Sequence, residues 1–133
     1  MKTTIQQSRH LAEIGIDFKT ADLTYERLAL SGLGIPDDMQ YRERFIPFQF
    51  FSGRGLPCWS LEALLELMPE EIVDKHKISL YKEGGIWVCC YQDINGNING
   101  NVEASCDVVV AAYRMVVWLV ENGFIKTEEE EQQ

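Results

Sequence analysis

Residues 106–126 read CDVVVAAYRMVVWLVENGFIK, and this stretch decides the fold class of the chain. Ser105 or Asp107 is placed to cap a helix start, and Asn122-Gly123-Phe124 predicts its end because glycine adopts the left-handed conformation of a C-cap. Between them, apolar residues recur at helical spacing: Val109, Ala112, Val116, Leu119 and Val120. The stretch predicts a helix over about residues 106–122, with an apolar face that must pack on a sheet or on other helices.

Three strand-like segments precede this helix, at about residues 77–82, 86–92 and 98–104. Glu83-Gly84-Gly85 separates the first two as a tight turn, and an Asn-Gly-rich turn separates the last two. The middle segment, Ile-Trp-Val-Cys-Cys-Tyr-Gln, is apolar on both of its alternating faces. We therefore predict a three-stranded antiparallel meander whose middle strand is covered on both sides, with the aromatic segment before Trp59 or a second subunit as the candidate covers.

Two more helices are expected before the meander. Thr4 and Gln7 have the spacing of a capping box for a helix over about residues 4–14, which Gly15 ends. Ser60 caps a second helix over about residues 60–68. The predicted fold class is α+β, in the order α-(arm)-α-β-β-β-α, as a single domain over residues 1–126.

The segment between these two helices has weaker patterns. Residues 20–30 suggest a short helix, and Tyr41–Phe51 is aromatic and β-prone. Pro47 restricts that run to an edge strand or an extended arm, so residues 36–56 are expected to be an aromatic arm that covers the core or meets a partner. The candidate protein-contact residues, for each of which core packing is the favoured alternative, are Phe45, Phe48, Phe50, Phe51, Trp59 and Trp87.

The charge of the chain limits its partners. The net charge is −9, from 12 basic and 21 acidic residues, and Glu128–Glu131 supplies four of the acids in an expected disordered tail over residues 127–133. This balance argues against a surface that neutralises phosphates, so we expect no direct nucleic-acid binding. An acidic protein that mimics DNA stays open as an alternative.

The cellular setting follows from two patterns. No apolar run reaches the ~20 residues of a membrane span, and the first ten residues lack the apolar stretch of a secretory signal. We therefore expect a cytoplasmic protein that does not enter a membrane. In a reducing cytosol the four cysteines, Cys58, Cys89, Cys90 and Cys106, are expected to stay thiols.

None of the potential chemical motifs has the spacing of a known site. Asp93–Asn99 resembles a calcium loop, but Ile98 and Ala104 stand where an EF-hand needs Gly and Glu, so a hairpin turn is favoured. No CxxC pair exists, and Cys106 near a helix start has no histidine beside it in sequence. We expect no metal, no cofactor and no catalytic residues.

The remaining titratable residues are expected at the surface. His10 lies on the polar side of the first helix, His76 lies in a charged turn, and Glu70 and Glu71 belong to a helix end. The order helix, three strands, helix also occurs in double-stranded RNA-binding domains. Residues 103–107, Glu-Ala-Ser-Cys-Asp, would repel the phosphates that such a domain grips with lysines at this place.

Several segments resemble a family of small proteins from gut Bacteroides and their phages or prophages. They are residues 3–8 (TTIQQS), 20–23 (TADL), 57–69 (PCWSLEALLELMP) and 115–125 (MVVWLVENGFI), and together with their surroundings they cover about half of the chain. The family has no assigned activity, so the resemblance implies a mobile-element protein of the bacterial cytoplasm and transfers no catalytic residue. Residues 24–56 depart from the family pattern.

These observations favour a non-enzymatic interaction or accessory protein of a phage or prophage, with a protein partner or a second copy of itself as a homodimer. Two alternatives remain at this level. One is a nucleic-acid-related regulator or acidic DNA mimic, and the other is a small enzyme that uses a thiol or a carboxylate.

Overall fold

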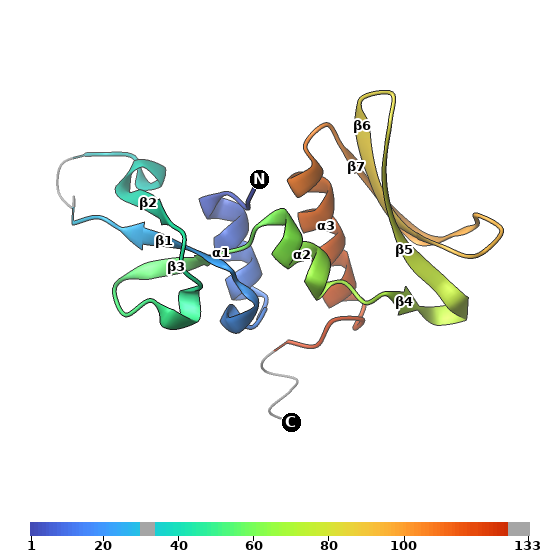
Figure 1. Ribbon diagram of the computed structural model, residues 1–133, viewed down its shortest axis with the longest axis horizontal. Coiled ribbons are helices and arrows are strands. Elements are labelled where there is room, and N and C mark those ends of the chain that lie inside the picture. The colour runs from blue at the N-terminus through green and yellow to red at the C-terminus, as the bar shows by residue number, and fades with distance from the viewer. Residues whose placement is uncertain (30–33, 128–133) are drawn as a thin grey trace.

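The computed structural model describes residues 1–29 and 34–127, and it has the α+β class that the sequence predicts. Over these residues it contains three α-helices and two antiparallel sheets, one of three strands and one of four. The two sheets lie at opposite ends of the molecule, and the helices lie between them (Figure 1).

The C-terminal sheet contains the predicted meander. Its order is β4 (Glu71–Ile72), β5 (His76–Glu83), β6 (Ile86–Gln92) and β7 (Ile98–Ser105), all antiparallel. Gly84 and Gly85 both have positive φ, as a two-residue turn of this hairpin requires. The short strand β4 was not predicted: Glu71, expected in a helix end, pairs with Lys77 of β5.

The N-terminal sheet corrects the interpretation of residues 17–58. Its order is β2 (Tyr41–Arg44), β1 (Leu23–Arg27) and β3 (Gly55–Cys58). The predicted helix over residues 20–30 is wrong where the structure describes it, because β1 occupies the centre of this sheet. Thr24 and Tyr25, adjacent residues, are both buried on opposite faces, which a central strand allows and a surface helix does not.

The predicted arm over residues 36–56 is therefore part of the domain's second sheet. It forms a 3-10 turn at Asp37–Gln40, strand β2, and a second turn at Phe48–Phe50 that follows Pro47. The edge-strand alternative was correct for Tyr41–Arg44, since β2 pairs only with β1. Pro47 lacks an N–H, and the strand has already ended three residues before it.

The three helices begin and end at the predicted caps. They are α1 (Ile5–Glu13), α2 (Leu61–Leu67) and α3 (Val108–Glu121). Thr4 and Gln7 form the capping box of α1, Ser60 caps α2, and the Asp107 carboxylate accepts the Val109 N–H at 2.9 Å. At the end of α3 the Phe124 N–H bonds the Leu119 carbonyl at 2.8 Å, which is the Schellman arrangement around Gly123.

One hydrophobic core joins the helices to the C-terminal sheet. The face of β6 that carries Cys89 and Tyr91 packs on this core, with Trp87 at its margin. The core's largest fully buried side chains are Trp59, Tyr91, Leu11, Leu64, Met115 and Leu119. Residues of α1, α2 and α3 all contribute to this core. The three helices therefore form one middle layer between the two sheets.

The C-terminal segment begins differently from the prediction. Thr127, expected in the acidic tail, is buried, and its side chain lies against Gly15 at the end of α1. The rest of the expected tail, residues 128–133, lies outside the described residues. Across residues 1–29 and 34–127, no helix is both long enough and apolar enough to cross a membrane.

Candidate functional site

The six candidate contact residues separate into buried and exposed groups. Trp59 is fully buried in the core, where its Nε1–H donates to Thr20 Oγ1 at 2.9 Å, and Trp87 packs at the core margin. Phe48 also packs against the core, edge-to-face on Phe18 with ring centroids 5.5 Å apart. For Trp59 the contact hypothesis is wrong, because no partner can reach a side chain with no exposed surface.

Phe45 and Phe50 remain as strongly exposed aromatic residues. Phe45 is 81% exposed directly after β2, and Phe50 is 72% exposed at the end of the 3-10 turn. A phenylalanine ring in water loses the free energy that burial would supply, about 2 kcal/mol for a fully buried side chain. Two such rings within six residues mark this part of the N-terminal sheet as a candidate contact surface.

Phe50 borders a hollow of about 440 Å³ on the N-terminal sheet, which we call the arginine–phenylalanine hollow. Its lining comes from the ends of β1 and β2 and from the loop before β3. The lining residues are Glu26, Arg27, Arg44, Ile46, Phe50, Phe51, Ser52, Gly53 and Arg54. Three arginines and one glutamate give this lining a formal charge of 3 − 1, or +2, in a chain whose net charge is −9.

Glu26 organises two of the cations around the hollow. Its Oε2 receives Arg44 Nη1 at 3.1 Å, and its Oε1 receives Arg42 at 2.6 Å. All three side chains project from the same face of the sheet, because Glu26 is the direct cross-strand partner of Arg42 and Arg44 lies two residues further along β2. One carboxylate thus holds two guanidinium groups in place, with one positive charge in excess.

Arg27 and Arg54 also belong to the lining, but the Arg27 side chain projects from the opposite face of β1 to Glu26, as its cross-strand partner Tyr41 does. The Arg27 guanidinium lies 5.8 Å from the centre of the Tyr41 ring and donates weakly to Gln40 Oε1 at 3.4 Å. The Arg54 side chain is exposed and has no hydrogen bond or ion pair within the described residues. Arg54 is therefore a cation whose charge nothing in the described part of the chain neutralises.

The Phe51 ring is held by glycines of the same loop. A Cβ atom on Gly55 would lie 2.7 Å from Phe51 Cε1, and one on Gly53 would lie 3.0 Å from Phe51 Cζ. The ring therefore occupies the space that side chains would fill at both positions. This packing fixes the wall of the hollow beside Arg54.

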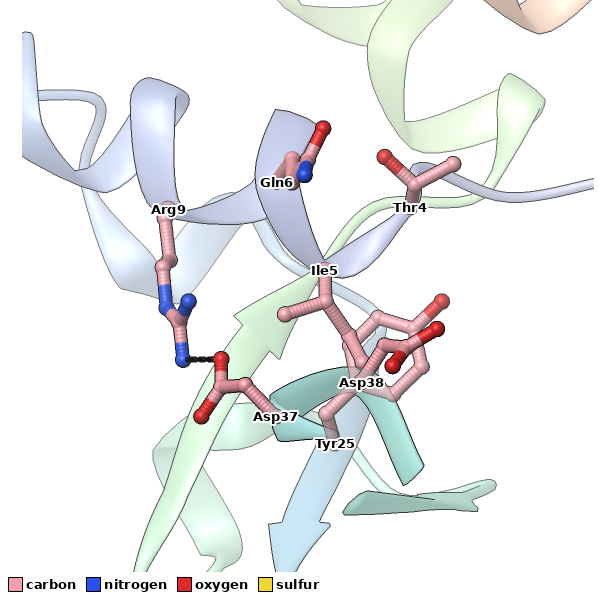
Figure 2. Close-up of a pocket in the computed structure, with 7 residues that line it drawn as sticks. All are labelled: Thr4, Ile5, Gln6, Arg9, Tyr25, Asp37 and Asp38. Atoms are coloured by element: carbon pink, nitrogen blue, oxygen red, sulfur yellow. Dashed lines mark ion pairs between the residues drawn. The ribbon is translucent and has the colours of Figure 1, made fainter. Parts of the chain in front are cut away.

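A second hollow, of about 750 Å³, lies between α1 and the N-terminal sheet. Figure 2 shows the Arg9 side chain reaching from α1 to the Asp37 carboxylate, so an ion pair joins α1 to the 3-10 turn that precedes β2. Its seven lining residues are Thr4, Ile5, Gln6, Arg9, Tyr25, Asp37 and Asp38. Arg9 also donates to the Tyr41 hydroxyl at 3.2 Å, and this hydrogen bond is the largest cause that raises the pKa of Arg9.

The residues that line this second hollow have a structural role. Its residues include no cysteine, histidine or lysine, and the Thr4 hydroxyl is engaged by the Gln7 N–H as the helix cap. The Arg9–Asp37 pair is partly exposed, where such pairs contribute about 0.2–1 kcal/mol. We interpret the hollow as the junction between α1 and the sheet.

The C-terminal sheet has an uncovered outer face. In Figure 1, α3 lies on one side of the sheet, and none of the described helices or strands lies on the other. The partly or fully exposed apolar residues on that face are Tyr81, Ile86, Val88, Ile98, Val102 and Ala104. The predicted cover over both faces of β6 is therefore wrong within one chain: α3 covers only one face.

The Asp93–Asn97 turn beside this face is a hairpin, as the sequence indicates. The Asp93 carboxylate accepts the N–H groups of Asn95 and Asn97 at 2.9 Å each, and the Asn97 bond is the largest cause that lowers the pKa of Asp93. Among the described residues, no group of three His, Cys, Asp or Glu side chains is placed to hold a metal ion.

The four cysteine thiols differ in their burial. Cys58, Cys89 and Cys90 are buried, and burial raises the pKa of each thiol, that of Cys89 to about 12. Cys106 is exposed, one residue before the cap of α3. The three buried thiols are therefore protonated at neutral pH and unsuited to nucleophilic attack.

Both histidines are partly exposed, and each has a hydrogen-bond partner. His10 Nδ1 hydrogen-bonds the Tyr113 hydroxyl, so it joins α1 to α3 and is half-buried. His76 Nδ1 hydrogen-bonds the Val73 carbonyl at 2.9 Å and is also partly buried. Neither ring lines one of the hollows described above or lies beside a thiol.

Comparison of the chain with protein families, with curated proteins and with solved structures found no match.

Proposed function

We propose that this chain is a non-enzymatic interaction or accessory protein that acts by binding other protein surfaces. The observation that carries the proposal is the exposure of Phe45 and Phe50, of which Phe50 lines the cationic hollow. Aromatic residues and arginine are the residue types most enriched in the energetically important centres of protein interfaces. The phage or prophage setting and the bacterial host rest on the sequence resemblance alone.

The arrangement of titratable groups supports a binding role over a catalytic one. A nucleophile needs a base within hydrogen-bond reach, and both histidines are engaged elsewhere. The buried thiols have raised pKa values, and the second hollow holds only the paired Arg9–Asp37 and the carboxylate of Asp38 as charged groups. These observations support contact with other proteins as the role of the arginine–phenylalanine hollow.

Affinity capture tests the proposal. Wild-type protein and a Phe45→Ser/Phe50→Ser variant are used as baits in host lysate, and retained proteins are identified by mass spectrometry. Because both rings are exposed, the variant should keep its melting temperature. A protein retained by the wild type and by a Met39→Ser control, yet lost by the double variant, is the expected result. Identical retention by all three baits would contradict the role of these rings.

Point variants are preferable to a deletion of residues 36–56. That deletion would remove β2 and the turn that carries Phe48, so the sheet itself would be lost. If the deletion variant failed to capture a partner, the loss would then reflect misfolding and not the removal of a contact surface.

We also propose that the outer face of the C-terminal sheet meets a second copy of the chain. Strand β7 is an eight-residue edge with no lysine and no proline, the residues that commonly protect edges, and Val102 on it is 44% exposed. Light scattering should give about twice the 15.3 kDa chain mass for the wild type. Val102→Lys should give the single-chain mass, and Met39→Lys, at the opposite end, should not. A single-chain mass for the wild type at every concentration would reject self-association.

A further inference from the structure

Arginine is unevenly distributed in this protein. Four of the six arginines of the chain, Arg27, Arg42, Arg44 and Arg54, lie in or beside the arginine–phenylalanine hollow. Among the described residues, the carboxylate that forms ion pairs with this group is that of Glu26, which pairs with Arg42 and Arg44. Counting Arg42 with the lining, the local charge is 4 − 1, or +3, on an acidic protein.

This positive charge is only partly neutralised within the chain. Arg54 has no side-chain partner among the described residues, and Arg27 has one long hydrogen bond and a contact with the Tyr41 ring. Guanidinium groups bind carboxylates and phosphates strongly because their donors match two oxygens at once. The hollow therefore offers one cation, Arg54, that an anion can approach without breaking an ion pair.

The aromatic rings restrict which anion fits. Phe50 and Phe51 line the same hollow as Arg44 and Arg54, and Phe50 is largely exposed to solvent. A small inorganic anion would use the arginines and leave the Phe50 ring in water. A ligand that covers both needs carboxylates or phosphates alternating with apolar groups along an extended chain.

The net charge of the protein distinguishes between two ligands of this kind, a nucleic acid and an acidic peptide. A nucleic acid carries a phosphate at every nucleotide and would extend past the hollow over a protein with a net charge of −9. A short peptide with two or three carboxylates interacts mainly with charges within about one Debye length, ~8 Å at physiological salt. The local positive charge favours the peptide, and the global negative charge disfavours the nucleic acid.

We propose that the arginine–phenylalanine hollow binds an acidic segment of a partner protein, with a carboxylate on Arg54 and an apolar side chain on Phe50. This inference rests on the proposed function, since it names the kind of partner that an interaction protein of this shape would take. The Glu26 pairs keep Arg44 and Arg42 in position while the segment binds.

Fluorescence anisotropy with a defined probe tests it. The probe is a labelled hexapeptide, Asp-Phe-Asp-Glu-Phe-Asp with blocked ends, and the comparison ligands are its Asn/Gln counterpart and a labelled 15-nucleotide oligothymidine. The full chain should bind the acidic peptide at least tenfold more tightly than the amide peptide or the oligonucleotide. Raising the salt from 50 to 200 mM should weaken this binding severalfold.

Variants assign the binding to the hollow. Arg54→Glu reverses a charge that has no partner in the fold, so it should weaken peptide binding about tenfold without changing the melting temperature. Arg114→Glu makes the same charge change on an exposed residue of α3 and should alter binding less than twofold. Phe50→Ala should weaken binding about fivefold.

The outcomes separate this inference from the proposed function. Equal binding of the acidic and amide peptides, tighter binding of the oligonucleotide, or no loss with Arg54→Glu would each overturn the acidic-segment assignment. If partner capture is still lost with Phe45→Ser/Phe50→Ser in those cases, the interaction role stands and only the partner chemistry is wrong. If capture is also unchanged, both proposals fall.

Discussion

The tightest packing around the arginine–phenylalanine hollow is at Gly55, and Gly55→Ala is the sharpest test of this part of the structure. An added Cβ would lie 2.7 Å from Phe51 Cε1 and 2.8 Å from the Tyr25 carbonyl oxygen. Real Cβ atoms essentially never come this close to other atoms. The Tyr25 oxygen belongs to the central strand β1, which is paired on both sides and cannot retreat without disturbing both ladders.

The expected cost follows from these two contacts. Forcing extra carbon into a well-packed site costs about 1–3 kcal/mol, and we expect the upper half of this range because one of the two obstacles is backbone. For a chain of this length, a loss of about 2 kcal/mol corresponds to a melting temperature lower by about 6–10 °C. Since Phe51 must shift, the acidic hexapeptide should also bind less tightly.

Urea unfolding of four proteins measures the effect: wild type, Gly55→Ala, Phe51→Leu and the double variant. Removing the ring should relieve part of the clash, so the double variant should be more stable than the sum of the single losses predicts, by about 1 kcal/mol. The contact with the Tyr25 carbonyl oxygen remains in the double variant, so part of the loss in stability remains as well. A Gly55→Ala protein within about 0.5 kcal/mol of wild type would refute this packing.

Three further predictions concern stability and the thiols. Asp107→Ala should destabilise the protein by about 1 kcal/mol in urea unfolding, because the cap of α3 is lost, whereas Asp107→Asn keeps an acceptor oxygen and should change little; equal losses would argue against the cap. In the folded protein at pH 8, a thiol reagent such as dithionitrobenzoate should label Cys106 rapidly and the other three cysteines only after unfolding; rapid labelling of more than one thiol would contradict their burial. The free energy of unfolding should be unaffected by these buried groups below about pH 9 and should fall as the pH rises toward 12. The reason is that Cys89, with a folded pKa of about 12, keeps its proton after the unfolded thiol has lost it, and burial raises the pKa of Tyr25 and Tyr91 in the same direction; a flat profile between pH 9 and 11 would contradict the assignment.

The elements that the sequence predicted correctly have strong local signals. The caps at Thr4, Ser60 and Asp107 and the stop at Gly123 depend on residues within five positions of each other, so their chemistry is readable without tertiary information. The meander followed from the same kind of signal, since the Gly84-Gly85 turn tolerates positive φ.

The N-terminal sheet was missed because its pairing is not local. Strand β1 is central and buried on both faces, so Leu23–Arg27 has no clean alternation, and its partners lie 14 or more residues away along the chain. Strands β2 and β3 are four residues each, and β3 contains Pro57. Short strands with proline are typically interpreted as loops, and only the neighbouring β1 makes them a sheet.

The candidate site was predictable only in part. The exposed Phe45 and Phe50 belonged to the predicted aromatic set, although Trp59 in that set is core. The sequence does not group the arginines because Arg27, Arg44 and Arg54 are spread over 28 positions, and Glu26 reaches Arg44 only after β1 and β2 pair. The repeated occurrence of arginine and phenylalanine from Arg42 to Arg54 is the pattern in the sequence that could have indicated this site.

The placement of the helices between two outward-facing sheets has a consequence for assembly. A ligand on the three-stranded sheet and a second copy on the four-stranded sheet would attach at opposite ends, so neither would obstruct the other (Figure 1). A pair of chains joined through β7 would then present two cationic hollows pointing apart. Such a pair can bridge two ligand molecules, or hold one flexible ligand that carries two acidic segments far more tightly than either hollow alone.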